Sequence, residues 1–231
     1  MADRWVEIAA ESGRFKAFVA EPTGTPKGAV VVIQEIFGVN EGVRGKAAWL
    51  AKEGYLAIAP DLFWRIEPGV QLTDKTEAEW KRAFELMNAF KADTGIADIQ
   101  RTIDHVRDAG KIAKVGAVGY CLGGLLADLT ACRTNVDAAV GYYGVSIDAN
   151  LDAAANLKTP LMLHIAGKDQ FVKKEAQDAI VNGLKPNPNV TTYVYPEQDH
   201  AFTRIGGAHY DAHAAELADA RTVAFFRQHI G

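Results

Sequence analysis

Cysteine is scarce in this chain, with only Cys121 and Cys132 among 231 residues. Cys132 falls on the helix predicted to begin directly after Cys121, about three turns or roughly 16 Å further along at 1.5 Å per residue. That separation is too long for a disulfide, whose Cα atoms lie within about 7 Å. A disulfide-stapled extracellular scaffold is therefore excluded, and we expect reduced thiols and a cytoplasmic protein.

Long apolar runs and blocks of one charge are also missing. No apolar run approaches the roughly 20 residues that a membrane-spanning helix requires. The first residues are charged and contain no apolar segment, so we expect no signal peptide. The formal net charge is −4 and the basic residues are dispersed. These features predict no nucleic-acid partner and no membrane partner.

Metal-ligand spacing is absent as well, because the six histidines form no ligand pattern with each other or with cysteine. We therefore expect no metal and no other cofactor. What the chain does have is apolar content, with 48% hydrophobic residues. That content supports a sizeable core, and the length suits one domain over residues 1–231. We expect this domain to be a monomer.

Short apolar runs alternate with helical segments along most of the chain. An antiparallel pair is predicted at Trp5–Ile8 and Phe15–Val19. Buried strands are predicted at 29–33, 55–59, 115–118, 138–142, 161–165 and 192–195, and helices at 43–53, 77–90, 96–109, 122–131, 173–184 and 212–229. This alternation favours an α/β fold whose mostly parallel sheet has helices on both faces. Residues 63–75 are predicted to form an excursion at the rim of the site.

The segment Gly119-Tyr120-Cys121-Leu122-Gly123 follows the apolar run 115–118 directly. The nucleophile elbow of an α/β-hydrolase typically follows a strand directly. Its pattern is glycine, any residue, the nucleophile, any residue and glycine. On the motif alone, a small buried packing cysteine is an equally good interpretation. The strand before Cys121 and the helical sequence after it favour the nucleophile, since a helix N-terminus and a nearby histidine can make a thiolate available.

Two partners for this nucleophile follow in the order that the fold requires. Asp169 lies in a glycine-containing turn after the run 161–165, and an ordinary loop or N-cap aspartate is the alternative interpretation. His200 lies in a loop after the last predicted strand, at the sheet edge where ligands bind. Five other histidines fall within a predicted strand or on or beside predicted helices: His105, His164, His209, His213 and His229. Asp199 is adjacent to His200, but neighbouring side chains diverge, so Asp169 is preferred as the orienting acid.

Two backbone N–H groups are expected to bind the oxyanion of the reaction. One belongs to Leu122, directly after the nucleophile, and the other to Ile36, in the loop after the run 29–33. Glu35 stands in the same loop and should project toward the edge that carries Cys121. A solvent-facing carboxylate is its alternative interpretation.

The segments 34–38, 119–124 and 200–204, together with the Asp169 loop, make the chain resemble the dienelactone hydrolases over nearly its whole length. This resemblance implies an α/β-hydrolase fold with a Cys121, His200 and Asp169 triad. It also implies that Glu35 contacts the resting thiol and that Arg204 lies near Glu35 and the substrate carboxylate. The family cleaves a lactone ester in the catabolism of chlorinated aromatics.

The chain departs from this family's pattern at several positions. Ala201 stands where serine often follows the catalytic histidine, and Phe84 stands where tyrosine can occur. The family's second substrate-binding arginine should fall near Trp80-Lys81-Arg82. Trp80 matches that position and Arg82 is the nearby candidate, while Phe37 is expected to contact the substrate.

The sequence thus predicts a thiol hydrolase of small esters or lactones, dienelactone-like and carboxylate-bearing, that acts through an acyl-enzyme. The nearest alternative is a general carboxylesterase or thioesterase on the same fold. A different class of function stays open, in which a non-catalytic α/β protein binds a ligand or senses redox state through Cys121.

Overall fold

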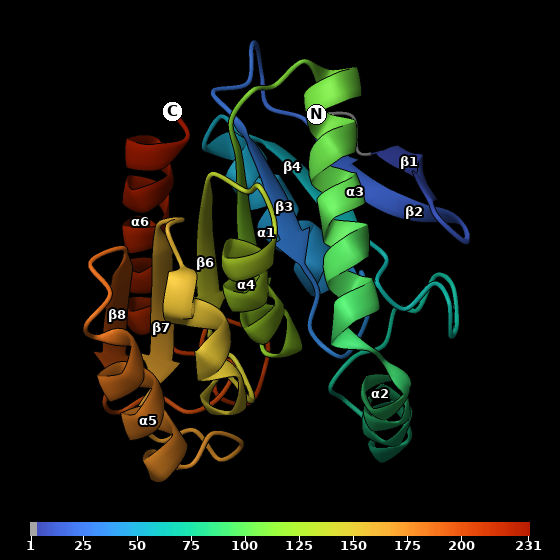
Figure 1. Cartoon of the computed structure of the whole chain (residues 1–231). Helices are drawn as coiled ribbons and strands as arrows, with labels where there is room; N and C mark the ends of the chain where they lie inside the picture. The colour runs from blue at the N-terminus through green and yellow to red at the C-terminus, as the bar shows by residue number, and fades with distance from the viewer. Residues whose placement is uncertain (1–3) are drawn as a thin grey trace.

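The computed structural model describes residues 4–231, which are built around one eight-stranded sheet in the order β1-β2-β4-β3-β5-β6-β7-β8 (Figure 1). The strands are β1 (Arg4–Ala10), β2 (Gly13–Ala20), β3 (Ala29–Ile33), β4 (Leu56–Pro60), β5 (Val115–Tyr120), β6 (Ala138–Tyr142), β7 (Leu161–Ala166) and β8 (Val190–Tyr195). β1 and β2 form an antiparallel hairpin, and β2 pairs antiparallel with β4. All the remaining neighbours are parallel. The predicted mostly parallel sheet is confirmed.

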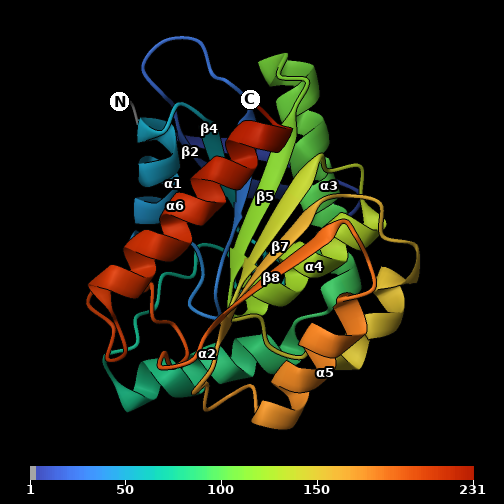
Figure 2. The same cartoon turned by 90° about the vertical axis from the view of Figure 1, so that its left-hand side faces the viewer.

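The central strands are mostly apolar, as expected for strands that are covered on both faces. Every residue of β3, β5, β6 and β7 is buried. Helices α1 (Glu41–Lys52) and α6 (Ala212–His229) cover one face, as Figure 2 shows. Helices α3 (Ala92–Gly110) and α4 (Leu122–Arg133) cover the other, with α5 (Lys174–Leu184) and the 3-10 helix η1 (Asp148–Asn156) packed beside them. The structure therefore has the α/β-hydrolase architecture that the sequence predicted.

Helix α2 (Glu77–Ala89) does not cover either face of the sheet but lies across the carboxyl ends of the strands (Figures 1 and 2). Residues 63–75 lead into it without regular structure, as predicted, apart from one bridge between Gly38 and Gln71. At Gly38 φ is 77°, and a Cβ would lie 2.0 Å from the carbonyl oxygen of Val70. Glycine is therefore required at Gly38, where the loop after β3 meets the excursion before α2.

Three elements differ from the sequence-based expectation. The strand predicted to be buried at 192–195 belongs to β8, which lies at the edge of the sheet and buries only Tyr195. Helix α3 begins at Ala92, a turn earlier than predicted, and so includes Gly95, on which a Cβ would lie 2.3 Å from the Phe90 ring. The 3-10 helix η1 was not predicted at all. Within residues 4–231, no helix is both long and apolar enough to cross a membrane.

Candidate active site

Cys121 occupies the sharp turn between β5 and α4, with φ 57° and ψ −115°. A positive φ costs a non-glycine residue on the order of 1–3 kcal/mol, so the surrounding backbone must impose it. A Cβ on Gly119 would lie 1.8 Å from the carbonyl oxygen of Gly123, and a Cβ on Gly123 would lie 2.5 Å from that of Ile33. Glycine is therefore obligatory on both sides of Cys121, as the motif predicted.

His200 and Asp169 meet in the buried interior beside this turn. The ring Nδ1 of His200 lies 2.8 Å from Asp169 Oδ2. The other carboxylate oxygen, Oδ1, accepts the backbone N–H groups of Phe171 and Val172 at 2.8 and 3.1 Å. Both oxygens of the Asp169 carboxylate thus have hydrogen-bond partners, and one of them is directed at the imidazole.

The electrostatics of His200 link it to the cysteine as well as to the aspartate. Burial alone would lower the pKa of His200, but the negative charge of Cys121 and the hydrogen bonds with Asp169 and Cys121 raise that pKa to about 10. The surroundings therefore favour the protonated imidazolium form of His200, and a cationic histidine is one of the features that can activate a thiol nucleophile. Cys121 and His200 also line one small cavity of about 50 Å³, together with Ile36 and Phe171.

Asp199 and His164, the alternatives to Asp169 and His200, make other contacts. Asp199 accepts the backbone N–H groups of Gln170 and His200 at 3.0 and 2.6 Å, so its carboxylate organises the loop. His164 is fully buried and bonded to Tyr195 and Thr222 at 2.8 and 3.0 Å. Burial, helped by nearby positive charge, lowers the pKa of His164 to about 3, so this ring is a neutral core histidine.

The two expected oxyanion donors lie on segments that meet beside Cys121, and Ile36 lines the small cavity with Cys121 and His200. Leu122 is the first residue of α4, so its N–H has no acceptor within the helix. The close approach of Gly123 to the carbonyl oxygens of Ile33 and Gln34 brings this helix start against the loop that carries Ile36. Among residues 4–231, neither the Leu122 nor the Ile36 N–H has a hydrogen-bond acceptor. Both residues are buried, and the oxyanion role of their N–H groups stays a prediction.

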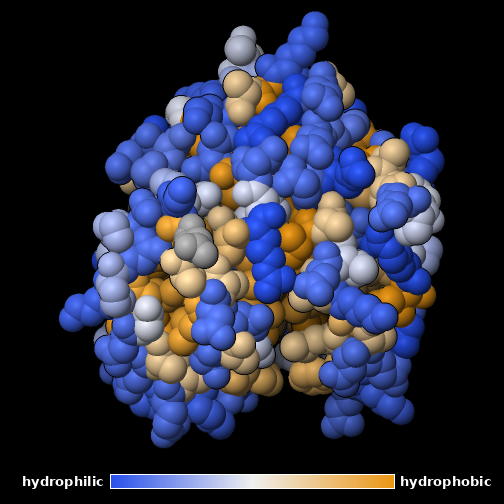
Figure 3. All heavy atoms as spheres, in the orientation of Figure 1, coloured by the Kyte–Doolittle hydropathy of each residue, from blue (hydrophilic) through white to orange (hydrophobic). Residues whose placement is uncertain are grey.

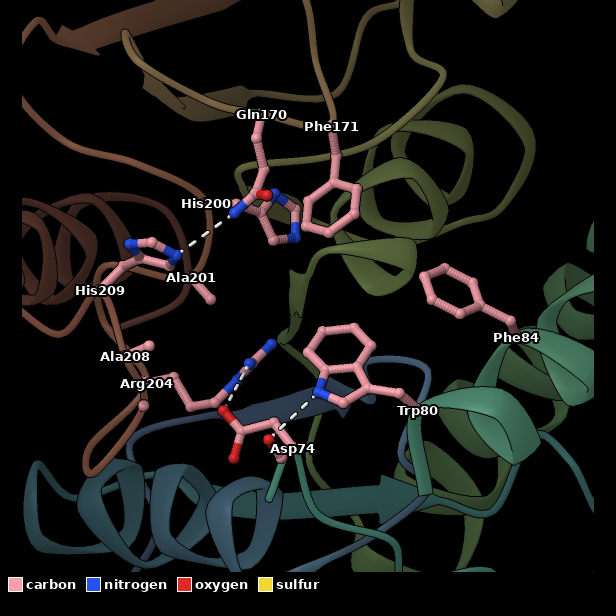
Figure 4. Close-up of a pocket in the computed structure, with 11 residues that line it drawn as sticks. Asp74, Trp80, Phe84, Gln170, Phe171, His200, Ala201, Arg204, Ala208 and His209 are labelled. Atoms are coloured by element: carbon pink, nitrogen blue, oxygen red, sulfur yellow. Dashed lines mark hydrogen bonds and ion pairs between the residues drawn. The ribbon is translucent and has the colours of Figure 1, made fainter. Parts of the chain in front are cut away.

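Arg204 lies between the carboxylates of Glu35 and Asp74 at the side of the pocket, and Figure 4 shows its pairing with Asp74. Its Nε and Nη2 donate to Glu35 Oε2 and Oε1, both at 2.9 Å, and its Nη1 donates to Asp74 Oδ2 at 3.0 Å. Burial alone would lower the pKa of Arg204, but the charge of Glu35 raises it above its ordinary value. Both oxygens of Glu35 are thus held by the guanidinium. Among the residues described, no hydrogen bond joins Glu35 to Cys121.

Arg82 is not among the residues that line the catalytic cavities, and a substrate contact by Arg82 stays a prediction. It is half-buried on α2 and pairs with Glu67 and Glu85. Trp80 is the residue of this segment that enters the pocket, and its indole Nε1 donates to the backbone oxygen of Asp74 at 3.1 Å. The helical period explains the difference, because residues two apart point to different sides of a helix.

An aromatic wall surrounds the rest of the pocket. We use this name for Phe37, Trp80, Phe84 and Phe171. The Trp80 ring lies 5.0 Å from Phe37, 5.7 Å from Phe84 and 6.5 Å from Phe171, centroid to centroid. Figure 3 shows apolar side chains around a hollow between the parts of the surface that carry α2 and α5. The main cavity here has about 420 Å³, enough for a small organic molecule.

Three residues of the site were missed by the sequence analysis. Asp74 lies in the irregular excursion, where no pattern marks a contact. Phe171 follows Asp169 by two positions, and its ring lies 4.8 Å from that of His200. Tyr143 directly follows β6 at the same edge of the sheet. Its place directly after a predicted strand could have marked it as a residue of the site. Its ring contacts His200 at 5.1 Å, and its hydroxyl lies 2.9 Å from the Thr203 hydroxyl.

Comparison with known proteins places this arrangement in a family. The model of the "Dienelactone hydrolase family" matches residues 15–230. A protein of Azospirillum brasilense named "Putative carboxymethylenebutenolidase" is 50% identical over 228 residues, covering 96% of this chain and 97% of its own. The carboxymethylenebutenolidase of Pseudomonas putida is 39% identical over 212 residues, covering 91% and 90%.

A solved structure agrees with these sequence matches. The crystal structure of a "Putative Dienelactone Hydrolase" from Klebsiella pneumoniae subsp. pneumoniae MGH 78578 has a TM-score of 0.87 at 29% identity and covers 99% of each chain. The resemblance stated from the motifs is therefore confirmed. This chain belongs to the dienelactone hydrolase family and is a carboxylic ester hydrolase.

Proposed function

We propose that this enzyme cleaves a small carboxylate-bearing lactone or ester of the dienelactone type through a Cys121–His200–Asp169 triad. The observation that carries the proposal is the meeting of a strained, glycine-flanked cysteine with a histidine whose other nitrogen is bonded to a buried aspartate at 2.8 Å. Nucleophile, base and orienting acid in this order constitute the machinery of acyl transfer. The names of the relatives point to the same substrate class.

The first half of the reaction forms a thioester. Cys121 Sγ attacks the carbonyl carbon while its proton resides on His200, and the N–H groups of Leu122 and Ile36 stabilise the oxyanion. The carbon–oxygen bond then breaks, and His200 gives its proton to the leaving oxygen. In a lactone this oxygen stays attached to the acyl group, so ring opening releases nothing.

Water completes the reaction. His200 takes a proton from water, the hydroxide attacks the thioester, and the thiolate leaves with the acid as product. Asp169 remains ionised throughout and stabilises the imidazolium that forms in each half. No other group is needed for the atoms and protons to balance.

Arg204 is the proposed contact for the substrate carboxylate. It lines both the small cavity that holds Cys121 and the main cavity beside it. A guanidinium can donate two parallel N–H bonds to a carboxylate, which a lysine ammonium cannot reproduce. Glu35 is proposed to set the charge of this group and, when it leaves Arg204, to interact with the thiol of Cys121.

A general carboxylesterase is the second candidate. It is favoured by the aromatic wall and by the pairing of Arg204 with two carboxylates, both of which suit an uncharged substrate. A panel of lactones and esters separates the two. The proposal predicts higher kcat/KM for a carboxylate-bearing lactone than for its methyl ester, and the reverse order would support the esterase.

The same panel tests the enzyme itself. Cys121→Ala should remove turnover, while Cys132→Ala, on the same helix, should retain it. If the wild type labels with a thiol reagent but turns over no member of the panel, the protein is a ligand-binding or redox-sensing relative. A monomeric state and a cytoplasmic location stay predictions, and a small molecule is the proposed partner.

A further inference from the structure

Asp74 and Arg204 are shared by two cavities. The main catalytic cavity of about 420 Å³ contains His200, and a second cavity of about 570 Å³ lies between α1 and the loops at residues 73–75 and 203–205. Of the residues that line them, only Asp74 and Arg204 belong to both. The ion pair between these two side chains therefore forms the partition between the cavities.

The two carboxylates on Arg204 are held very differently. Glu35 accepts two hydrogen bonds from Arg204 and lies two residues after the end of the buried strand β3. Asp74 accepts one, from Nη1, and belongs to the irregular excursion before α2. Two parallel charge-assisted bonds are stronger and better oriented than one. Asp74 is therefore the easier of the two to remove.

Asp74 also has a second cation to move toward. The Nζ of Lys75 lies 3.5 Å from Asp74 Oδ1, and Lys75 lines the second cavity but not the catalytic one. A rotation of the Asp74 side chain away from Arg204 thus keeps its charge compensated. The released Nη1 of Arg204 would then face the catalytic cavity without a protein partner.

Charge favours such a movement when an anion binds. Two carboxylates, Glu35 and Asp74, already pair with the single guanidinium of Arg204, and the other nearby cation, Lys75, contacts Asp74 and not the catalytic cavity. Burial alone would raise the pKa of Asp74, but the hydrogen bond and charge of Arg204 hold it below its ordinary value, so Asp74 is ionised at neutral pH. A second anion cannot approach Arg204 favourably while both carboxylates remain.

We propose that Asp74 is a removable internal anion, whose place on Arg204 is taken by the carboxylate of the substrate. Asp74 is then a specificity-determining residue, because the free energy needed to displace it lowers the affinity for every anionic ligand. This inference rests on the proposed function, because it concerns how a carboxylate-bearing substrate reaches Arg204.

Binding of a matched pair of ligands tests the displacement without any turnover. Phenylacetate and phenylacetamide have nearly the same shape and differ in charge. Calorimetry would give the dissociation constant of each with the wild type and with Asp74→Asn, which keeps the shape of the side chain but removes its charge. Asp74→Ala serves as a second variant, and Asp93→Asn, an exposed carboxylate paired with Arg133, as the control.

We expect the Asp74 variants to gain affinity for phenylacetate but not for phenylacetamide. The ratio of the phenylacetamide to the phenylacetate dissociation constant should rise about tenfold in both Asp74 variants, which corresponds to about 1.4 kcal/mol, and should not change in Asp93→Asn. An unchanged ratio in folded Asp74 variants would overturn the inference, as would a selective loss of phenylacetate binding. Thermal unfolding of each variant verifies that the fold is kept.

Turnover separates a failure of this inference from a failure of the proposed function. With a carboxylate-bearing ester and its methyl ester as substrates, the anionic-to-neutral ratio of kcat/KM should rise by a similar factor in Asp74→Asn. If the wild type hydrolyses both esters and the ratio stays fixed, Asp74 has no such role but the hydrolase stands. If neither ester is cleaved, the proposed function fails, and the ligand-binding ratio still decides the role of Asp74.

Discussion

The two walls of the active site are built on different principles. On the side of β5 and α4, the backbone itself holds Cys121, since glycines at 119 and 123 leave no space for a side chain. On the side of α2, side-chain contacts hold the site residues in place. Glu35 and Asp74 pair with Arg204, and one hydrogen bond holds Trp80. The chemistry is therefore anchored in the rigid core of the sheet, while substrate choice depends on a region that can vary by single substitutions.

Breaking the backbone-held wall should have the largest effect. Gly123→Ala places a Cβ 2.5 Å from the carbonyl oxygen of Ile33, a backbone atom that cannot move independently. We expect kcat/KM to fall more than about 10³-fold, because a small displacement of the nucleophile is costly. Gly45→Ala in α1 is the control, since its Cβ would meet nothing within 4 Å. Equal activity of the two variants, measured with one ester, would contradict a backbone-imposed elbow.

Asp169→Asn should have the next largest effect, although it leaves the volume of the site unchanged. The amide can present an N–H to His200 Nδ1 and so favour the wrong tautomer, as in other triads, where the loss is about 10⁴-fold. We expect kcat to fall on the order of 10³-fold. The counterpart Asp199→Asn should lose far less, since Asp199 bonds only to backbone and to the rim residue His209. A pH–rate profile of both variants, with equal losses, would argue against Asp169 as the orienting acid.

The side-chain-held wall should show smaller and more selective effects. Arg204→Lys should lower kcat/KM about 10- to 100-fold for a carboxylate-bearing lactone, as expected from one charge-assisted hydrogen bond of about 1.5–3 kcal/mol. The loss with a neutral ester of similar size should be much smaller. Equal losses on both substrates would mean that Arg204 is structural, or acts only through Glu35.

The comparison also explains what the sequence could and could not predict. The elbow was predictable because a steric collision enforces its glycines, and the parallel sheet because burial on both faces leaves an apolar run. The direction of Arg82 was not predictable, because it depends on how α2 is rotated about its axis, and the packing of Trp80 against Phe37 and Phe171 decides that rotation. Asp74 carried no signal, since irregular loops obey no period, and its partner Arg204 lies 130 residues away.

The smallest effect on activity should come from Asp128, in α4 behind the elbow. Its Oδ1 is buried without a hydrogen-bond partner, and burial, opposed only weakly by Arg133, raises its pKa to about 7. The folded protein binds the Asp128 proton more tightly than the unfolded chain does. The resulting stabilisation is fully present below the ordinary pKa near 4 and is lost as the pH rises through 7. The loss reaches about 4 kcal/mol, at 1.36 kcal/mol for each pH unit.

Asp128→Asn should therefore raise the free energy of unfolding at pH 8 more than at pH 5, with kcat changed less than about twofold. Urea unfolding at the two pH values measures this difference, and Asp93→Asn is the exposed control. A gain that is the same at both pH values would show that Asp128 is not protonated in the folded protein at pH 5.

The central claim is that Cys121 forms a thioester with the acyl part of the substrate. Its most direct measurement is intact-protein mass spectrometry of enzyme quenched in acid during turnover of a slowly hydrolysed aryl ester. The account predicts an added mass equal to the acyl group, located on the peptide that contains Cys121. Cys121→Ala should show neither this adduct nor turnover. Turnover near the wild-type rate in Cys121→Ala, or an adduct on another residue of the catalytically active protein, would contradict it.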